Sequence, residues 1–204
     1  MQFSLVVPLL NESESLEELY QWIEKSLKGY SFELLFVDDG STDDSWSIIT
    51  ELAKKHDTVK GIRFAQNFGK SQALHAAFSE VQGKYVVTLD ADLQDSPEEI
   101  LPMVALMEEK QWDLISGWKK KRYDSFLFKN LPSRLFNWAA RRVSGIYLHD
   151  FNCGLKVYKR EVVQTLEVYG EMHRFIPVLA AQTGFHHKKE KTVQQGKALR
   201  AAVK

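Results

Sequence analysis

Features that mark secreted or membrane-spanning proteins are scarce in this sequence. Cys153 is the single cysteine among 204 residues, so no disulfide can form within the chain, which suits a reducing compartment. No stretch approaches the roughly 18 apolar residues of a membrane-spanning helix, and the N-terminus lacks the basic flank of a signal peptide. Internal repeats and low-complexity segments are also absent. We therefore expect a chain that is soluble or held at a membrane surface.

The net charge is zero as well, yet the two halves of the sequence differ strongly in charge. Residues 1–100 contain 18 Asp and Glu against 8 Lys and Arg, whereas residues 101–204 contain 9 against 19. Between residues 117 and 148, Asp124 is the single acid, and the basic residues are Lys119, Lys120, Lys121, Arg122, Lys129, Arg134, Arg141 and Arg142. This division favours an acidic half that collects a metal ion and a basic half that faces an anion. Two ordinary solvated faces are the alternative.

Strand-like apolar runs alternate with helical periods through the first half of the chain. At 44% hydrophobic residues, the chain can bury one sizeable core and is most simply one domain. We expect strands at Phe3–Pro8, Glu33–Asp38, Val59–Phe64, Tyr85–Asp90 and Trp112–Gly117. Two of the helices between them have clear start signals, because Ser15 and Glu18 form a capping-box pattern and Pro97 follows Ser96. The alternation predicts an α/β fold with a doubly wound, mostly parallel sheet and helices on both faces.

The pattern changes after Gly117. One face of a predicted helix carries Leu127, Leu131, Leu135 and Trp138, and Arg142 interrupts that face. A helix on a membrane surface and an ordinary helix packed on the core both account for this pattern, so both stay open. Further on, we expect a strand at Gly154–Tyr158, a helix at Glu161–Leu166 and a weakly patterned basic tail at Lys188–Lys204 that lacks a partner.

Three of the expected strands end in acidic or polar residues. Asp90 and Asp92 follow the fourth strand, Asp38 and Asp39 end the second, and Glu12 lies in the turn after the first. In a parallel sheet these turns lie along one edge, where ligands bind. Asp90 and Asp92 point the same way on an extended chain and could converge on one hard cation, which would neutralise a diphosphate leaving group. A solvated acidic turn is the plain alternative for an isolated pair of this kind.

Four segments, in order, resemble motifs of family 2 glycosyltransferases: Pro8 with Asn11-Glu12, residues 37–43, Asn67–Lys70 and Asp90–Asp95. Within that family, the chain most resembles the polyprenyl-phosphate sugar transferases, the group that acts on dolichyl or undecaprenyl phosphate, and the likeness covers most of residues 3–190. The resemblance implies a Rossmann-like GT-A fold and an inverting transfer from a nucleotide-diphosphate sugar with Mg²⁺ or Mn²⁺. Each motif is modest by itself, but four in order are specific.

The resemblance also implies roles for individual residues. Nucleotide-sugar binding falls to Pro8, Asn11, Glu12, Asp39, Lys70, Asp90 and Asp92, and metal binding to Asp90, Asp92 and Gln94. The catalytic acidic residue is Asp150, and the acceptor phosphate is bound by Arg122, Ser133, Arg134 and Arg174. The planar fork of an arginine suits a phosphate because it binds two oxygens at once.

The implied partners are a nucleotide-diphosphate sugar donor and a polyprenyl phosphate acceptor, with peripheral contact at the cytoplasmic face of a membrane and no nucleic acid. We expect a catalytic domain at residues 1–190 and a basic tail at 191–204. The tail departs from the family's basic loop, which precedes membrane helices in many members, so the chain is expected to be truncated or a soluble variant.

Two other functions fit part of the pattern. An apolar run before Asp-x-Asp also describes the nucleophile strand of haloacid-dehalogenase phosphohydrolases, although that strand opens their fold and is about the fourth here. The other alternative is a fragment that binds nucleotide or metal without turnover.

Overall fold

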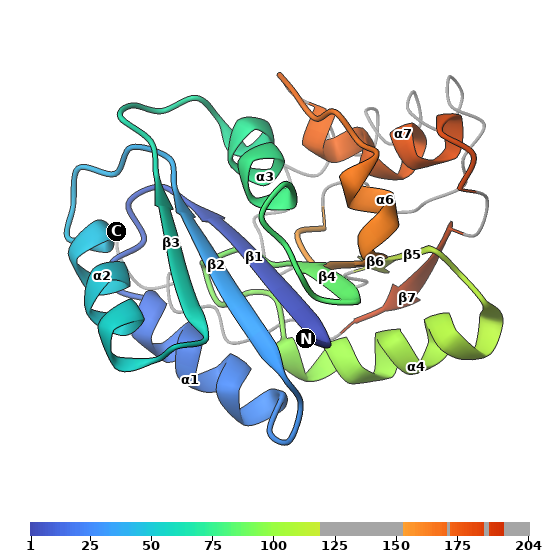
Figure 1. The fold of residues 1–204 in the computed structure, drawn as a ribbon, viewed down its shortest axis with the longest axis horizontal. Coiled ribbons are helices and arrows are strands. Elements are labelled where there is room, and N and C mark those ends of the chain that lie inside the picture. Colours follow the sequence, from blue (N-terminus) through green and yellow to red (C-terminus); the bar gives the residue numbers. More distant parts are fainter. Residues whose placement is uncertain (119–152, 171, 186–187, 194–204) are drawn as a thin grey trace, which may run out of the picture.

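The computed structural model describes residues 1–118, 153–170, 172–185 and 188–193. Strands and helices alternate through the first half, as the sequence predicts (Figure 1). The strands are β1 (Phe3–Leu9), β2 (Phe32–Asp38), β3 (Val59–Arg63), β4 (Tyr85–Thr88), β5 (Leu114–Trp118), β6 (Lys156–Lys159) and β7 (Lys188–Thr192). The helices are α1 (Leu16–Ser26), α2 (Ser45–Lys55), α3 (Lys70–Phe78), η1 (Pro97–Glu99), α4 (Ile100–Lys110), α6 (Arg160–Gln164), η2 (Met172–Phe175) and α7 (Ile176–Gln182).

The sheet of the described residues has seven strands in the order β3-β2-β1-β4-β6-β5-β7. β1, β2, β3 and β4 pair in parallel, and β7 pairs in parallel with β5. β6 lies between β4 and β5 and is antiparallel to both. The predicted mostly parallel sheet is therefore confirmed, and the loops that follow β1 to β4 all leave it at one edge.

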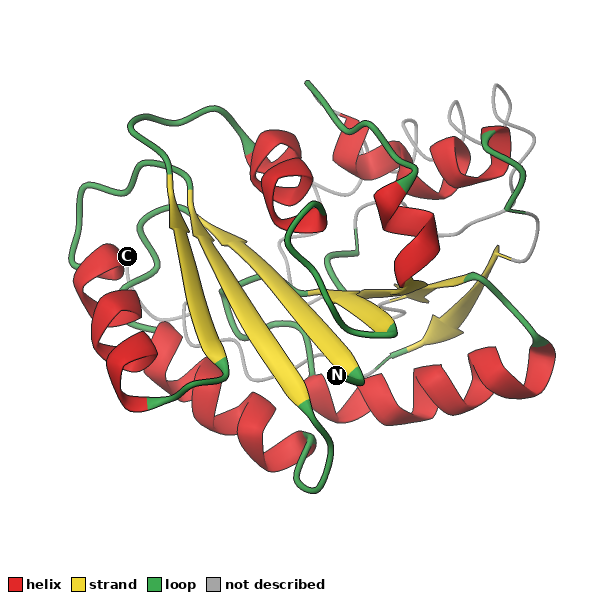
Figure 2. Ribbon diagram, viewed as in Figure 1, coloured by secondary structure: helices red, strands yellow, loops and turns green. Residues whose placement is uncertain are grey.

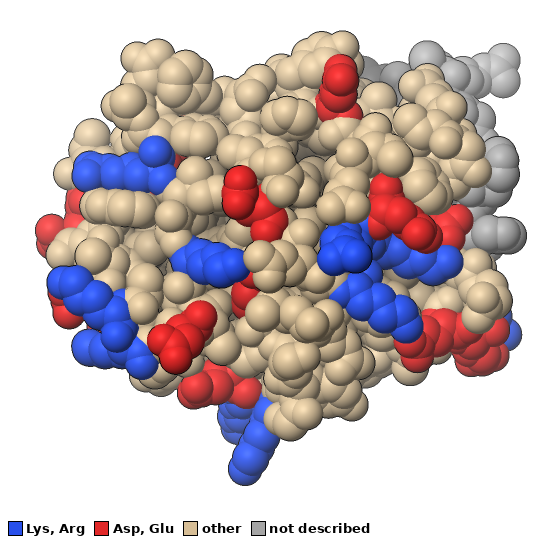
Figure 3. All heavy atoms as spheres, viewed as in Figure 1, with Lys and Arg blue, Asp and Glu red and all other residues tan. Residues whose placement is uncertain are grey.

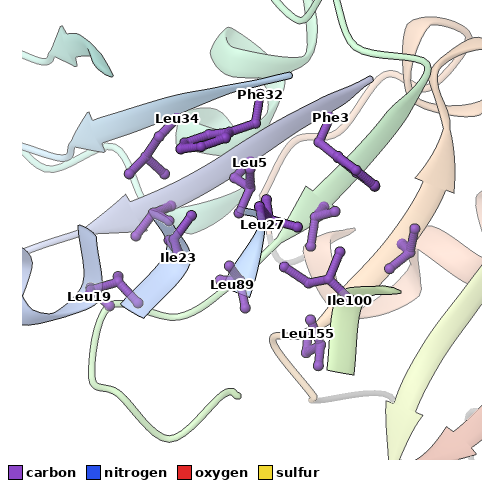
Figure 4. Close-up of a cluster of buried hydrophobic side chains, with 14 of the residues drawn as sticks. Phe3, Leu5, Leu19, Ile23, Leu27, Phe32, Leu34, Leu89, Ile100 and Leu155 are labelled. Carbon is purple, nitrogen blue, oxygen red and sulfur yellow. The ribbon is translucent and has the colours of Figure 1, made fainter. Parts of the chain in front are cut away.

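Helices cover both faces of the sheet, with α1, α2 and α4 on one face and α3, α6 and α7 on the other (Figure 2). Each face of the sheet has its own hydrophobic core, the first under α1, α2 and α4 and the second under α3, α6 and α7. Every residue of β1 and β2 is buried, because alternate side chains enter these two cores. Leu5 and Leu34 pack in the first core with Leu19 and Ile23 of α1, as Figure 4 shows. Val6 enters the second core, against α3. This two-sided burial explains why the strands read as mostly apolar runs, although β1 contains Ser4 and β2 contains Glu33.

The two predicted helix starts agree with the structure in position and differ from it in detail. Ser15 is at the N-cap of α1, but its side chain makes no capping hydrogen bond. Its hydroxyl instead donates to the carbonyl oxygen of Glu12, so the capping box with Glu18 does not form. The start at Ser96-Pro97 opens a short 3₁₀ turn, and the α-helix begins only at Ile100.

The C-terminal part differs more from the expectation. The sequence pattern predicts an unpartnered tail from residue 188, yet residues 188–192 form β7 and pair with β5. The predicted helix around residues 127–138 and the tail from residue 194 lie outside the described residues, and the domain boundary at 190/191 stays a prediction. No helix in the described ranges is long and apolar enough to cross a membrane. On the face seen in Figure 3, basic and acidic side chains lie side by side.

Candidate active site

The loops after β1 and β2 are tied together by short polar side chains. Asn11 has a positive φ of 56°, a conformation that asparagine tolerates better than most residues. Its side-chain oxygen accepts the Thr42 N–H at 2.8 Å, and its own N–H donates to the Ser41 hydroxyl at 2.9 Å. The Glu12 N–H donates to the Ser45 hydroxyl at 3.0 Å. These bonds hold Glu12 beside the end of β2.

A carboxylate at the end of β2 fixes the third loop. Asp39 is buried, and its two oxygens accept the N–H groups of Phe68 and Gly69 at 2.7 and 2.9 Å. Gly40 permits the close approach, because a Cβ on it would lie 2.5 Å from the carbonyl carbon of Gln66. Asp39 therefore fixes the backbone just before α3, whose first residue is Lys70.

These loops and the end of β4 surround a cavity of about 380 Å³, which we call the edge cavity. It is lined by Pro8, Leu9, Leu10, Glu12, Asp39, Asn67, Gly69, Lys70, Asp90, Ala91 and Asp92. Six of the seven residues predicted to bind the nucleotide sugar are in this lining. The seventh, Asn11, joins the two loops beside it and is not among the lining residues.

The loop after β4 is folded by its own carboxylates. The Asp90 N–H donates to a carboxylate oxygen of the buried Asp95 at 3.0 Å, and the Gln94 N–H donates to Asp92 at 3.0 Å. Leu93 between them has a positive φ of 61°. The loop packs against Gly154, where a Cβ would lie 2.5 Å from both carboxyl groups, Asp90 and Asp95. A side chain at 154 would therefore displace these two carboxyl groups, one of which belongs to a predicted metal ligand.

Lys70 contacts Asp90, one of the predicted metal ligands. Its ammonium donates to Asp90 Oδ1, and each side chain is about one-third exposed, at 34% and 31%. Burial disfavours the charged lysine, but the carboxylates of Asp90, Asp95 and Asp92 outweigh it and raise the Lys70 pKa. Lys70 therefore keeps its positive charge near neutral pH.

A second cavity of about 350 Å³, the inner cavity, lies behind the Lys70–Asp90 pair and shares both residues with the edge cavity. Its other lining residues are Leu74, Thr88, Leu89, Cys153, Gly154, Lys156, Tyr158, His173, Arg174 and Ile176. Lys156 is buried and donates to the carbonyl oxygen of Cys153. Tyr158 is fully buried, which raises the pKa of its hydroxyl. Three cationic side chains thus line this space.

A serine at the start of α3 connects the two sides of the inner cavity. Ser71 is fully buried, and its oxygen accepts the His173 N–H at 3.0 Å and lies 3.0 Å from His173 Nδ1. This contact places η2, and with it Arg174, next to Lys70. Sequence reasoning assigned no role to Ser71, Lys156 or Tyr158. The one available signal was a lysine inside the apolar strand run at 154–158.

The predicted metal ligands are partly assembled here. Asp90 and Asp92 line the same cavity and offer hard oxygen donors, which suit Mg²⁺ or Mn²⁺. Within the described residues, no group of three or more His, Cys, Asp or Glu could hold a metal by itself. The remaining ligands would have to come from a bound diphosphate or water, as is usual for Mg²⁺. Gln94 is in the same loop but not among the residues that line either cavity.

Of the predicted acceptor residues, Arg174 lines the inner cavity. Arg122, Ser133, Arg134 and the predicted catalytic Asp150 lie outside the described residues.

A mostly parallel α/β sheet with a carboxylate-lined cavity beyond its strand ends is the arrangement of nucleotide-binding enzymes. Residues 4–167 match the family described as Glycosyl transferase family 2, and the chain belongs to this family.

Solved structures agree on the fold. A mannosyltransferase from Pyrobaculum calidifontis in complex with GDP-Man and Mn²⁺ superimposes with a TM-score of 0.70 at 21% identity, over 98% of this chain and 58% of that one. Glucosyl-3-phosphoglycerate synthase from Mycobacterium tuberculosis with UDP gives 0.71 at 21%, over 96% and 72%. The fold is therefore the GT-A fold of glycosyltransferases.

Among curated proteins, the chain is 34% identical to dodecaprenyl-phosphate galacturonate synthase of Rhizobium johnstonii, over 89% of this chain and 54% of that protein. It is 38% identical to undecaprenyl-phosphate 4-deoxy-4-formamido-L-arabinose transferase of Shewanella sediminis, over 90% and 58%. The chain thus spans little more than half the length of these relatives.

Proposed function

We propose that the protein transfers a sugar from a nucleotide-diphosphate sugar to a polyprenyl phosphate. One observation carries this proposal: the edge cavity and the inner cavity meet at Asp90, a predicted metal ligand. A donor bound along this path has its nucleoside at one end, its diphosphate at the junction and its sugar directed toward the cationic inner cavity. The names of the two relatives support a polyprenyl phosphate as the acceptor, because one name contains dodecaprenyl phosphate and the other undecaprenyl phosphate.

In this arrangement the nucleoside lies against Pro8, Glu12 and Asp39. The carboxylates of Glu12 and Asp39 accept hydrogen bonds from base or ribose donors. Asp90 and Asp92, with Gln94 as a further candidate, would hold Mg²⁺ or Mn²⁺. When bound, the cation supplies Lewis-acid stabilisation of the charge that develops on the diphosphate.

The reaction forms a bond between an acceptor phosphate oxygen and the anomeric carbon, while the bond from that carbon to the nucleoside diphosphate breaks. Attack opposite the leaving group inverts the anomeric configuration. Arg174 contributes positive charge on the acceptor side, together with the predicted Arg122, Ser133 and Arg134. Because the acceptor phosphate is already ionised near neutral pH, Asp150 orients the reactants more than it removes a proton.

The acceptor carries a long lipid chain, so we also propose peripheral contact with the cytoplasmic face of a membrane, through the basic segment at residues 119–148. The match to a glycosyltransferase family does not support the phosphohydrolase alternative. A nucleotide-binding fragment without turnover is the outcome that the experiment below would separate from an active enzyme.

The first measurement is the melting temperature with UDP, GDP, CDP and their sugars, each with Mn²⁺, because a ligand that binds only the folded state raises it. The selected donor is then incubated with undecaprenyl phosphate in detergent, and release of the nucleoside diphosphate and the glycolipid product are followed. Asp92→Asn should abolish both the shift and the turnover, whereas Asp57→Asn, an exposed acid before β3 at the opposite edge, should change neither. A melting-temperature shift with no glycolipid product would contradict the proposed transfer, and unchanged turnover in Asp92→Asn would contradict the site.

A further inference from the structure

The Lys70–Asp90 ion pair occupies the position where the proposed function requires a metal ion. Lys70 donates to Asp90 Oδ1, and both residues line both cavities, so the pair forms the shared wall. We propose that Lys70 is a built-in competitor of the divalent cation. It holds the Asp90 carboxylate in the ligand-free protein and moves to the diphosphate when the nucleotide binds. This inference rests on the proposed function, since that function makes Asp90 a metal ligand.

The backbone at Lys70 is fixed, so the change involves the side chain alone. On one side, Asp39 accepts the N–H groups of Phe68 and Gly69. On the other side, Ser71 is hydrogen-bonded to His173. The lysine side chain between these anchors is flexible over four carbons and carries a compact, mobile charge. It can therefore exchange one anionic partner for another without any rearrangement of α3.

Electrostatics favour such an exchange. In the ligand-free protein, Asp90 pairs with the ammonium, and Asp92 and Asp95 also act on it electrostatically, so its positive charge offsets the mutual repulsion of the three carboxylates. A divalent cation at Asp90 would offset that repulsion better, but it would also repel the lysine at close range. The diphosphate removes this conflict, because it brings negative charge that serves as a new partner for Lys70.

Two consequences follow for binding. The metal alone should bind weakly, because it has to displace Lys70 without giving it a new partner. Metal and nucleoside diphosphate should each strengthen the binding of the other by the same factor, as linkage requires. Asp39 lines the edge cavity and accepts the N–H of Gly69, the residue before Lys70. A nucleoside at Asp39 and a metal ion at Asp90 would therefore act on the two ends of the same hydrogen-bonded segment.

The test is a Mn²⁺ titration followed by electron paramagnetic resonance of the free ion, with Mn²⁺ alone and then with saturating UDP or GDP. Replacing Lys70 by Gln removes the competitor. Lys70→Gln should therefore bind Mn²⁺ alone at least about tenfold more tightly than the wild type, and the gain in Mn²⁺ affinity on adding nucleotide should shrink. Lys70→Arg keeps the charge and should stay close to the wild type. Lys54→Gln removes a lysine that is ion-paired with Glu51 at 2.8 Å on α2, and it should change nothing.

Unchanged or weaker binding of Mn²⁺ alone by Lys70→Gln would overturn the competition between lysine and metal. Asp92→Asn separates this failure from failure of the proposed site. If Asp92→Asn loses Mn²⁺ binding while Lys70→Gln shows no gain, the metal site stands and the competition is wrong. If Asp92→Asn binds Mn²⁺ as the wild type does, the metal site itself is wrong, and this inference with it.

Discussion

The buried carboxylate of Asp39 allows a quantitative prediction, because both of its oxygens accept backbone N–H groups in the loop before α3. The distances are 2.7 Å to the Phe68 nitrogen and 2.9 Å to the Gly69 nitrogen. In Asp39→Asn the side chain keeps one acceptor oxygen but presents an NH₂ group to the other N–H. One charge-assisted hydrogen bond is lost, and the other becomes a neutral bond. Hydrogen bonds to charged groups contribute about 1.5–3 kcal/mol each, so we expect the free energy of unfolding to fall by about that amount.

A domain with a typical stability of about 5–15 kcal/mol would survive this loss. Urea denaturation followed by tryptophan fluorescence would measure the change, and hydrogen exchange of a peptide covering residues 64–70 would locate it. Asp57→Asn is the matched control, since an exposed carboxylate is expected to contribute within about 0.5 kcal/mol. If Asp39→Asn unfolds like the wild type and the exchange of residues 64–70 is unchanged, Asp39 does not hold this loop.

Three further predictions concern other contacts. Gly154→Ala places a Cβ that would lie 2.5 Å from the carboxyl group of Asp90, so isothermal titration calorimetry with Mn²⁺ and nucleoside diphosphate should show weakened binding. Binding equal to the wild type would contradict the tight packing at this position. Ser71→Ala removes the hydroxyl that contacts the N–H and ring of His173, and urea denaturation should show a loss of about 1–3 kcal/mol, with no loss indicating that this contact does not anchor η2. The Glu33 pKa is lowered, since hydrogen bonds from a lysine, a serine and a backbone N–H outweigh its burial. Because the folded pKa lies below the unfolded value, its stabilisation is present above about pH 4.3 and disappears as the pH falls through the folded pKa. The stability advantage of wild type over Glu33→Gln should therefore shrink below that pH in acid titrations of the unfolding free energy, and an advantage independent of pH would refute the assignment.

The sequence predicted the first half of the fold well because its strands are buried on both faces. Residues such as Val6 and Leu5 enter opposite cores, so β1 reads as a mostly apolar run in which Ser4 is the one polar residue. The cavity at the strand ends was predictable for a related reason. Parallel strands bring their carboxyl ends to one edge, and Glu12, Asp39 and Asp90 follow such ends.

The second half was harder to predict because its strands depend on their partners. β7 has the sequence Lys-Lys-Glu-Lys-Thr, which carries no apolar signal, and it is a strand only because it pairs with β5. The antiparallel direction of β6 has no local signature either, since an apolar run does not encode direction.

The contacts within the site were beyond sequence reasoning for another reason. Lys70 and Asp90 are 20 residues apart, and Ser71 and His173 are 102 apart. Such pairs are created by the packing of α3 and η2 on the sheet, which periodicity alone does not specify. Lys156 lies inside an apolar run, but its burial follows only from the position of β6 between β4 and β5.

The reversed direction of β6 has a consequence for how this scaffold can change. The edge cavity is lined by the loops that follow the parallel strands. Because β6 runs in the opposite direction, the inner cavity is lined instead by the start of β6, at Lys156, and by Gly154 just before it. The two cavities are thus built largely from different stretches of chain, which touch at the Asp90–Gly154 packing. Mutations could accumulate in the segment before β6, and alter what the inner cavity accepts, while the edge cavity keeps its residues. One edge cavity could in this way be combined with many different second halves, provided that position 154 keeps the close packing against Asp90.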